Sequence, residues 1–483
     1  MNSSNEIGIA IVGAGIAGLN AALTLQDAGM SCEIYEASDR VGGRMHSDSM
    51  SWADGQVSEW CGEFIDSDHT AIRGLARRFG LPLIDLGRGK GDRTQSVLYL
   101  GNHYYTGEEL ARDFGEIYPV LDQQMKEVGF PTTHTHFTKE GHRLDHLSVF
   151  DWVERYVKGG HGAPVGRMLD NACTGFFGLD SRLQSSLNLL YMFGPRAEED
   201  DEDEEEMGPM QGSSRIAGGN ERLPKAIANS LPEGSIHLKH RLEAIARENG
   251  GNISLTFATP NEPLEVICKH VILTLPFSTL RHIDYKQAGF DELKQVAITQ
   301  LGYGTISKLF LQFDTRYWYE DGPWPRSNNG FIITDLDIQT LWDSSIGQPG
   351  NSGLLVNYTS GHRGAAFKPP APYTTTESAP EIGVYVQRCL EQLEHVFPGI
   401  SKHYLGKGAL SYSTGDPHLL GSYACWRVGQ YTQFAGYERV RQGNIHFAGE
   451  HCSVEFQGFM EGAAREGERA ACEILEDEGL NAH

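Results

Sequence analysis

The chain has 483 residues, 40% of them hydrophobic and 22% charged, and its 40 Lys and Arg against 64 Asp and Glu give a net charge of −24. A single hydrophobic core stops growing at about 250–300 residues, so we expect several subdomains. The acidic balance argues against binding to nucleic-acid phosphates or to anionic membranes. The eight cysteines are scattered without a C-x-x-C pair, so they predict neither a zinc site nor a disulfide framework.

The N-terminal segment, Met1 to Glu6, lacks the basic and apolar parts of a secretory signal. No stretch of the sequence is long and apolar enough to span a bilayer. We therefore expect a soluble cytoplasmic protein with no nucleic acid and no membrane among its partners.

The predicted elements begin with a βαβ unit, in which Ile7 to Val12 form a buried strand, Asn20 to Ala28 a helix and Cys32 to Glu36 a second strand. Later elements follow in chain order: a helix over 67–80, a mostly helical region over 107–193, strands from about 236, a buried strand over 271–276, a strand over 306–313 and a last helix from about 458. This order is typical of an α/β protein.

One low-complexity segment interrupts the chain. Residues 198–206 are nine consecutive acids. Like charges at this density repel one another and remain hydrated. We therefore expect residues 198–208 to form a mobile surface loop; an acidic docking site is the alternative.

A glycine motif, Gly13-Ala14-Gly15-Ile16-Ala17-Gly18, joins the first strand to the first helix. In that context G-x-G-x-x-G predicts a dinucleotide site. Gly13 permits the tight turn, Gly15 lets the backbone approach a pyrophosphate, and Gly18 lets helix and strand pack closely. Ala17 belongs to the same candidate cofactor-binding surface, since the helix N-terminus offers N–H groups and a positive dipole end to phosphates.

An acid follows at the expected distance. Glu36 ends the second strand, 18 residues after Gly18, where a carboxylate accepts the ribose hydroxyls of an adenosine. An acid there disfavours the 2′-phosphate of NADP. The diglycine of Arg40-Val41-Gly42-Gly43-Arg44 comes directly afterwards and extends the predicted phosphate-binding surface.

The segment Glu36-Ala37-Ser38-Asp39-Arg40-Val41-Gly42-Gly43-Arg44 resembles the flavin-containing amine oxidases, a family that includes monoamine, polyamine and L-amino acid oxidases. Two further segments resemble the same family: His446-Phe447-Ala448-Gly449-Glu450-His451 with Gly458 to Ala471, and Gly218 to Pro224. Because these segments lie at both ends and in the middle, the resemblance covers essentially the whole chain.

The resemblance implies an α/β fold with a Rossmann-like FAD-binding domain, a mixed-sheet substrate domain and a helical insertion. The implied boundaries are residues 1–85, 212–280 and 438–483 for the FAD-binding domain, 86–110 and 281–437 for the substrate domain, and 111–211 for the helical domain. It also implies flavin contacts at Gly219, Gly449, Glu450 and Phe459. The dipole of the last helix would stabilise the anionic edge of reduced flavin.

The residues implied for the chemistry begin with Lys308. It lies in a predicted strand, sharing a face with Phe310 and Gln312, and matches the family's lysine that holds a water against flavin N5. Tyr423 and Phe459, beside Gly458, match the two rings that flank a substrate amine. Trp426 and Trp342 are weaker candidates for the same pocket. No metal is required, because the flavin supplies the redox chemistry.

The linkage of the flavin follows from one position. Ser422 stands where monoamine oxidases carry the cysteine that bonds the flavin, and Cys425 is offset by three residues. The resemblance therefore implies non-covalent FAD, with O₂ as the second substrate and a homodimer as one candidate assembly.

The substrate remains open between two classes. An L-amino acid oxidase needs a cation for the α-carboxylate; residues 58–67 contain no arginine, but Arg427 is a substitute, and residues 429–434 resemble that class. We therefore favour oxidative deamination of L-amino acids to 2-oxo acid, ammonia and H₂O₂. The alternative is a primary amine, diamine or polyamine oxidase, in which Asp66 meets a distal ammonium unless it caps the following helix. Oxygenating relatives and a non-catalytic flavin scaffold remain as minor alternatives.

Overall fold

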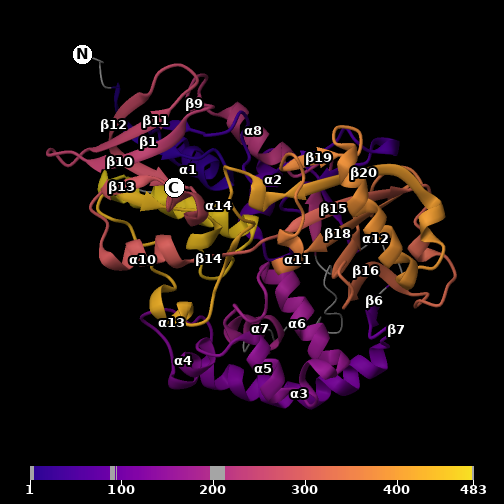
Figure 1. The fold of residues 1–483 in the computed structure, drawn as a ribbon. Helices are drawn as coiled ribbons and strands as arrows, with labels where there is room; N and C mark the ends of the chain where they lie inside the picture. Colours follow the sequence, from indigo (N-terminus) through magenta and orange to yellow (C-terminus); the bar gives the residue numbers. More distant parts are fainter. Residues whose placement is uncertain (1–4, 88–92, 94, 196–212, 481–483) are drawn as a thin grey trace.

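The computed structural model describes residues 5–87, 93, 95–195 and 213–480, so the acidic segment 198–208 lies outside the described residues. The described chain forms two eight-stranded sheets and a group of helices (Figure 1). The first sheet lies near the N-terminus, and the second sheet lies beside it (Figure 1). Helices α3 to α7 lie below both sheets in the same view. This is the α/β arrangement that the sequence predicted.

The first sheet has the order β13-β10-β11-β12-β1-β2-β9. The eighth strand, β22, lies outside this order and also pairs with β12. Its central pairs, β12-β1, β1-β2 and β12-β22, are parallel. The bounds are β1 (Asn5–Val12), β2 (Glu33–Tyr35), β9 (Ile236–His237), β10 (Arg241–Arg247), β11 (Ile253–Ala258), β12 (Leu264–Leu273), β13 (Asp284–Gln287) and β22 (Ile445–Phe447).

Four helices cover one face of this sheet: α1 (Ile16–Asp27), α2 (Thr70–Arg78), α8 (Arg222–Ser230) and α14 (Met460–Asp477). Alternation along β1 explains the layering, because successive side chains of a strand point to opposite faces. Ile9 and Ile11 pack with these helices, whereas Ala10 and Val12 belong to the cluster on the other face. Helices from the two ends of the chain thus share one core.

The second sheet has the order β19-β20-β15-β18-β17-β16-β6-β7 and is antiparallel except where β16 pairs with β6. Leu309 and Leu311 of β15 pack toward α12 (Gly383–Val396), while Phe310 packs with a cluster on the opposite face. The bounds are β6 (Gln95–Leu100), β7 (His103–Tyr104), β15 (Ser307–Phe313), β16 (Asn328–Thr334), β17 (Thr340–Asp343), β18 (Gly353–Thr359), β19 (Tyr373–Thr375) and β20 (Tyr404–Tyr412).

The helical layer begins with α3 (Gly107–Val128), whose N-terminus has a capping box between Thr106 and Glu109. It continues with α4 (Lys139–Asp145), α5 (Val149–Tyr156), α6 (Pro164–Phe177) and α7 (Ser186–Phe193). The shorter elements are β3 (Ser47–Asp48), β4 (Ser58–Glu59), β5 (Leu83–Asp85), β8 (Ser214–Ile216), α9 (Phe277–Leu280), α10 (Glu292–Gln300), β14 (Gly302–Tyr303), α11 (Gly361–Ala365), β21 (Ala424–Cys425) and α13 (Gln430–Phe434).

Two sequence-based boundaries differ from the structure. Strand β13 pairs with β10 in the first sheet, so that sheet reaches at least residue 287 rather than ending at 280. The first helix begins at Ile16, inside the glycine motif, rather than at Asn20. Among the described residues, no helix has the length and hydropathy needed to cross a membrane.

Candidate active site

A cavity of about 1660 Å³ runs between the two sheets and the helical layer. Its wall includes the turn before α1, the start of α14, strand β15 and the end of α6. Sites for one small ligand usually measure about 300–1,000 Å³. The cavity is therefore large enough for an extended cofactor together with a substrate.

The nucleotide end of the cavity follows the glycine motif. Gly13, with φ +107°, Gly15 and Ala17 lie in the wall, and a Cβ on Gly15 would meet only open space. Gly18 lies behind the wall, where a Cβ would come within 2.0 Å of the Gly13 carbonyl oxygen. This placement agrees with the packing role predicted for Gly18. The open backbone at Gly15 fits the close approach of a pyrophosphate.

The Glu36 carboxylate is buried in the same wall. Its Oε2 accepts a hydrogen bond from the Ala14 backbone N–H at 2.7 Å, and its Oε1 accepts from the backbone and hydroxyl of Ser38 at 2.8 and 2.7 Å. These bonds fix the carboxylate beside the glycine turn. The position fits an acceptor for the ribose hydroxyls of an adenosine.

The diglycine segment covers the turn from the other side. Gly42 and Gly43 have φ values of +105° and +53°, and Gly42 pairs with Gly15 in an isolated β-bridge. A Cβ on Gly42 would lie 2.6 Å from the Met45 carbonyl oxygen. The Arg40 guanidinium donates to the Gly43 carbonyl at 2.9 Å. Arg40, Gly42 and Gly43 all line the cavity, as the cofactor-binding prediction requires.

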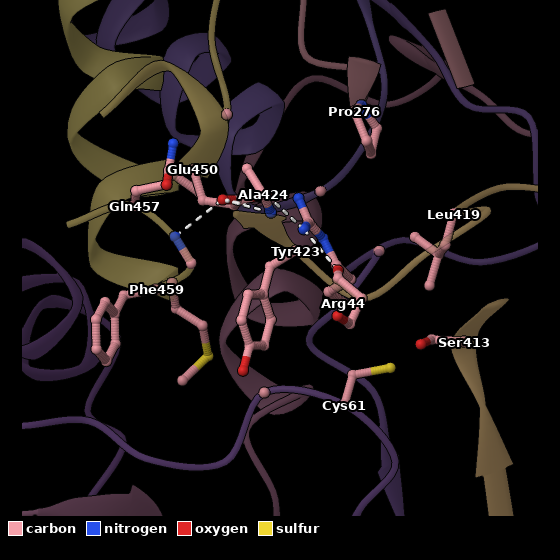
Figure 2. A pocket seen from close by; sticks show the side chains of 18 of the residues that line it. Arg44, Cys61, Pro276, Ser413, Leu419, Tyr423, Ala424, Glu450, Gln457 and Phe459 are labelled. Carbon is pink, nitrogen blue, oxygen red and sulfur yellow. Dashed lines mark hydrogen bonds and ion pairs between the residues drawn. The ribbon is translucent and has the colours of Figure 1, made fainter. Parts of the chain in front are cut away.

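An ion pair joins the two ends of the chain (Figure 2). Arg44 Nη1 donates to Glu450 Oε1 at 2.7 Å and to the Ser422 carbonyl at 2.9 Å. Glu450 also accepts from the backbone N–H groups of Ala424 at 3.2 Å and Gly458 at 2.9 Å. Burial disfavours the charged guanidinium, but the adjacent Glu450 raises the pKa of Arg44 overall. Glu450 thereby fixes the loop that carries Tyr423 and the loop that starts α14.

The last helix begins at this loop. Phe459 is the N-cap of α14, and the backbone of Gly458, with φ +89°, turns the chain into the helix. Gly449, Gly458, Phe459 and Met460 line the cavity. The unpaired N–H groups and the positive dipole end of an 18-residue helix therefore face the site. This arrangement fits an anionic ring edge of a flavin.

Lys308 is buried in β15 and lines the cavity. Its Nζ donates to the carbonyls of Glu59 at 2.6 Å and Cys61 at 3.1 Å, and to Glu63 Oε2 at 3.0 Å. Burial alone would raise the pKa of Glu63, but Lys308 and Arg215 hold it below its usual value. The ammonium group is therefore fixed in one position and keeps a charged partner.

A second layer supports the segment that holds Lys308. Asn220 donates through Nδ2 to the carbonyls of Gly62 and Glu63, and its backbone N–H donates to Glu59. Burial raises the pKa of Glu59 to about 8. Gly219, with φ +106°, packs against Ser47 and does not line the cavity. Contact of Gly219 with the cofactor stays a prediction; its segment supports Glu59 and Glu63 through Asn220.

Aromatic side chains surround the end of the cavity near Lys308. The Tyr423 hydroxyl lies 2.9 Å from the Tyr358 hydroxyl and donates to the Phe176 carbonyl. The ring of Phe459 lies 5.1 Å from His69 and 5.9 Å from Phe176. Tyr423 and Phe459 thus share one wall, as the sequence predicted. Tyr358 was missed, because β18 carries no motif that marks it.

Both predicted tryptophans reach the cavity. Trp342 packs 5.1 Å from the Tyr358 ring and 5.5 Å from Lys308 Nζ, and its buried Nε1 has no hydrogen-bond partner. Trp426 packs mainly into the core, 5.0 Å from Tyr431 and 5.7 Å from Phe434. Trp342 is therefore the better placed of the two to touch a substrate.

Arg427 does not reach the site. Its side chain is exposed and absent from the cavity wall. Neighbouring residues of an extended segment point to opposite sides, and the inward position is taken by Trp426. The prediction of Arg427 as the carboxylate partner is therefore wrong.

Asp66 does line the cavity, beside His69, whose ring lies 5.1 Å from that of Phe459. Its Oδ1 accepts from the Ser213 hydroxyl at 2.5 Å, and its Oδ2 lies 3.7 Å from His69 Nε2. It does not cap α2, whose N-cap is His69. Asp66 therefore remains a candidate to meet a cationic group of a substrate.

The family follows from comparison with known proteins. A sequence model of the flavin containing amine oxidoreductases matches residues 16–475. The chain is 24% identical to the putative L-amino-acid oxidase YobN of Bacillus subtilis, covering 96% of this chain and 94% of that protein. It is 25% identical to putrescine oxidase of Kocuria rosea, covering 97% and 95%. The chain belongs to the flavin-containing amine oxidase family.

Solved structures share the fold. Cyclohexylamine oxidase from Brevibacterium oxydans superposes with a TM-score of 0.80 at 20% identity, covering 98% of this chain and 99% of that one. Wild-type putrescine oxidase bound to putrescine gives 0.78 at 22% identity, covering 98% and 100%. The protein is thus an enzyme of this family, with a flavin cofactor and a small-molecule amine and O₂ as its substrates.

Proposed function

We propose that the protein is an FAD-dependent oxidase of primary amines that lack an α-carboxylate. The Lys and Arg side chains in the described part of the cavity wall carry this proposal, since each already has a partner. Arg40 donates a hydrogen bond to the Gly43 carbonyl. The other three form ion pairs: Arg44 with Glu450, Arg241 with Glu243, and Lys308 with Glu63. Arg40 bonds only a neutral carbonyl, but it lies at the diglycine of the cofactor end; a carboxylate at the aromatic end would meet Lys308, whose charge Glu63 already offsets.

The aromatic end suits an amine instead. Tyr358, Tyr423, Phe459 and Trp342 offer ring faces, which attract cationic amines. Asp66 adds an acid in the same region, which suits a second ammonium in a diamine. The chemistry that FAD supplies when bound is acceptance of a hydride equivalent from the carbon bearing the amine, followed by reduction of O₂ to H₂O₂.

The chain's own residues then have separate roles. Glu36 and the turn of Gly13, Gly15 and Ala17 would hold the adenosine and pyrophosphate. Arg44, Glu450 and the start of α14 would hold the ring end. Lys308 holds a fixed ammonium in the wall beside the rings, where it can donate to a water by sharing one of the three N–H groups that Glu59, Cys61 and Glu63 accept.

Non-covalent attachment of FAD is part of this proposal. Cys425 is buried and absent from the cavity wall. Cys61 does line the cavity, but burial raises the pKa of its thiol, so it stays protonated and unreactive. After acid precipitation the yellow chromophore should remain in the supernatant. Flavin that pellets with wild-type protein and not with Cys61→Ser would instead establish a thioether bond.

Oxidation of L-amino acids is the second candidate. Several similar curated proteins are named L-amino-acid oxidases, among them one from Siganus canaliculatus at 25% identity. Trp342 lines the cavity and its buried Nε1 has no hydrogen-bond partner, so a rotation of the ring would offer this donor to a carboxylate oxygen. In this case Trp342→Phe should raise KM for amino acids and leave KM for amines unchanged.

Peroxide release on matched pairs separates the candidates. Each pair contains an L-amino acid and its decarboxylated amine: phenylalanine with phenethylamine, tryptophan with tryptamine, ornithine with putrescine, and lysine with cadaverine. We expect the amine to have at least ~10-fold higher kcat/KM within its best pair, about 1.4 kcal/mol. The reverse preference would favour the second candidate. No peroxide from any pair by FAD-loaded protein would contradict both.

A further inference from the structure

A cluster of metal-ligand side chains lies outside the cavity, where β12 and β22 meet the last turn of α14. His270, His446 and Asp477 each place one ligand atom within 4.8 Å of the other two. None of the three lines the cavity. The site is separate from the amine oxidase chemistry, and the three ligands come from three different elements.

The hydrogen bonds of the two histidines define which nitrogens are free. His446 Nδ1 lies 2.7 Å from Glu473 Oε2, and His270 Nε2 lies 3.0 Å from Glu478 Oε1. A carboxylate only accepts, so these nitrogens carry the protons. The other two, His446 Nε2 and His270 Nδ1, then carry lone pairs. Both are buried without a hydrogen-bond partner.

This pattern is characteristic of metal ligands. A ligating histidine usually donates its second N–H to a carboxylate, which fixes the tautomer and the ring orientation. Here both rings are held in this way, and they are 0% and 5% exposed for His446 and His270. The cluster therefore combines two buried, unpartnered imidazole nitrogens with a carboxylate, whose donor in this structure is Arg441.

We propose that His270, His446 and Asp477 bind one divalent transition-metal ion of the Zn²⁺ class. Two imidazoles and a carboxylate suit Zn²⁺, with a water as fourth ligand, whereas Mg²⁺ and Ca²⁺ prefer oxygen ligands alone. Ligand bonds of about 2.0–2.2 Å require the cluster to contract, and Asp477 is exposed, so its side chain can move toward the histidines once Arg441 releases it. The ion fastens the C-terminal end of α14 to two strands of the first sheet.

Arg441 gives the proposal a directional test. Its Nη1 lies 2.5 Å from Asp477 Oδ2 and competes for that carboxylate. Arg441→Met should therefore tighten metal binding. If the cluster were only an internal ion-pair network, Arg441→Met would remove an interaction and improve nothing.

The experiment uses FAD-loaded protein stripped with chelator and titrated with Zn²⁺ by calorimetry and thermal unfolding. We expect one ion per chain and a Tm that rises with Zn²⁺ concentration. Asp477→Asn and His446→Gln should weaken binding at least 10-fold, Arg441→Met should strengthen it, and Mg²⁺ should have no effect. His362→Gln, at an exposed histidine paired with Asp180, is the matched control and should bind as wild type does.

Two results would overturn the proposal: no Zn²⁺-dependent change in Tm, or equal affinity in wild type and Asp477→Asn. Because Asp477 is exposed, this variant should fold even if His446→Gln does not. An unchanged flavin spectrum will confirm that its fold is intact. Co²⁺ bound to wild type should absorb at longer wavelengths than the flavin, and the band should be missing in Asp477→Asn.

Discussion

Glu63 and Lys308 form a buried ion pair in the wall of the cavity, with 3.0 Å between Glu63 Oε2 and Lys308 Nζ. Glu63 follows the cofactor-binding segments, whereas Lys308 belongs to β15 of the second sheet. Two further groups surround the other carboxylate oxygen, Glu63 Oε1. Arg215 Nη1 lies 3.6 Å from this oxygen, and the Ser344 hydroxyl donates to it at 2.8 Å. The pair therefore fixes the position of a cavity ammonium relative to the cofactor site.

Replacing Lys308 tests its role in the chemistry. Lys308→Met should slow flavin reduction or reoxidation by at least ~10-fold, about 1.4 kcal/mol of transition-state stabilisation. Stopped-flow absorbance resolves the two half-reactions. FAD should stay bound, and Lys368→Met, at an exposed lysine beside Tyr412, should react normally. Wild-type rates in both half-reactions would remove Lys308 from the mechanism.

Glu63 acts on the reaction through Lys308. Glu63→Gln keeps the shape but removes the charge that compensates the buried ammonium, so the ammonium loses its counter-ion. We expect kcat to lose its wild-type pH profile while KM changes little. A merely structural role would instead lower stability and leave the pH profile of kcat unchanged.

Glu450 should control retention of the cofactor. Glu450→Gln removes the charge that pairs with Arg44 and weakens the bonds to Ala424 and Gly458, so the loops at the ring end should loosen. The ratio of flavin to protein absorbance after gel filtration should fall. The control is Glu461→Gln, a buried acid on α14 that accepts from α2 and does not line the cavity. Equal flavin loss in both variants would argue against a specific role.

The raised pKa of Glu59 predicts a pH dependence of stability. Its pKa is about 8 in the fold against 4.5 as the ordinary value, so the folded state binds one more proton between these two pH values. The contribution of Glu59 to stability is therefore fully present below about pH 4.5 and is lost toward pH 8, by at most about 1.4 kcal/mol per pH unit. Glu59→Gln should flatten that part of the curve in denaturant titrations. An unchanged slope would show that Glu59 ionises normally.

Two glycine substitutions should have opposite effects. A Cβ on Gly467 of α14 would lie 2.1 Å from the Ala17 carbonyl of α1, so Gly467→Ala must push the helices apart. It should cost about 1–3 kcal/mol of unfolding free energy and weaken FAD binding. Gly74→Ala, where a helical Cβ meets nothing within 4 Å, should stabilise by about 0.5–1 kcal/mol. Urea titrations measure both.

The cofactor site was predictable because its signals are local. Gly13, Gly15 and Glu36 belong to one short βαβ unit, and their spacing follows from strand and helix geometry. Gly18 was likewise predictable as a packing residue. The alternation of Lys308 with Leu309 correctly predicted which face of β15 meets the cavity.

The errors and omissions are non-local. Arg427 is adjacent to a residue of the cavity wall, but sequence distance does not tell which of two neighbours points inward. Glu63 and Tyr358 become site residues only through tertiary contacts, 245 and 65 positions from their partners Lys308 and Tyr423. The sequence carries no spacing that marks such contacts.

The contact between α1 and α14 also determines when the cofactor can bind during synthesis of the chain. Asn20 Nδ2 donates to the Ala464 carbonyl, 444 positions later in the chain, and Arg44 meets Glu450. While the ribosome still holds the last helix, the nucleotide turn exists without its opposite wall. The flavin can therefore be captured stably only after translation has passed these residues, and a nascent chain must persist as an apoprotein until then.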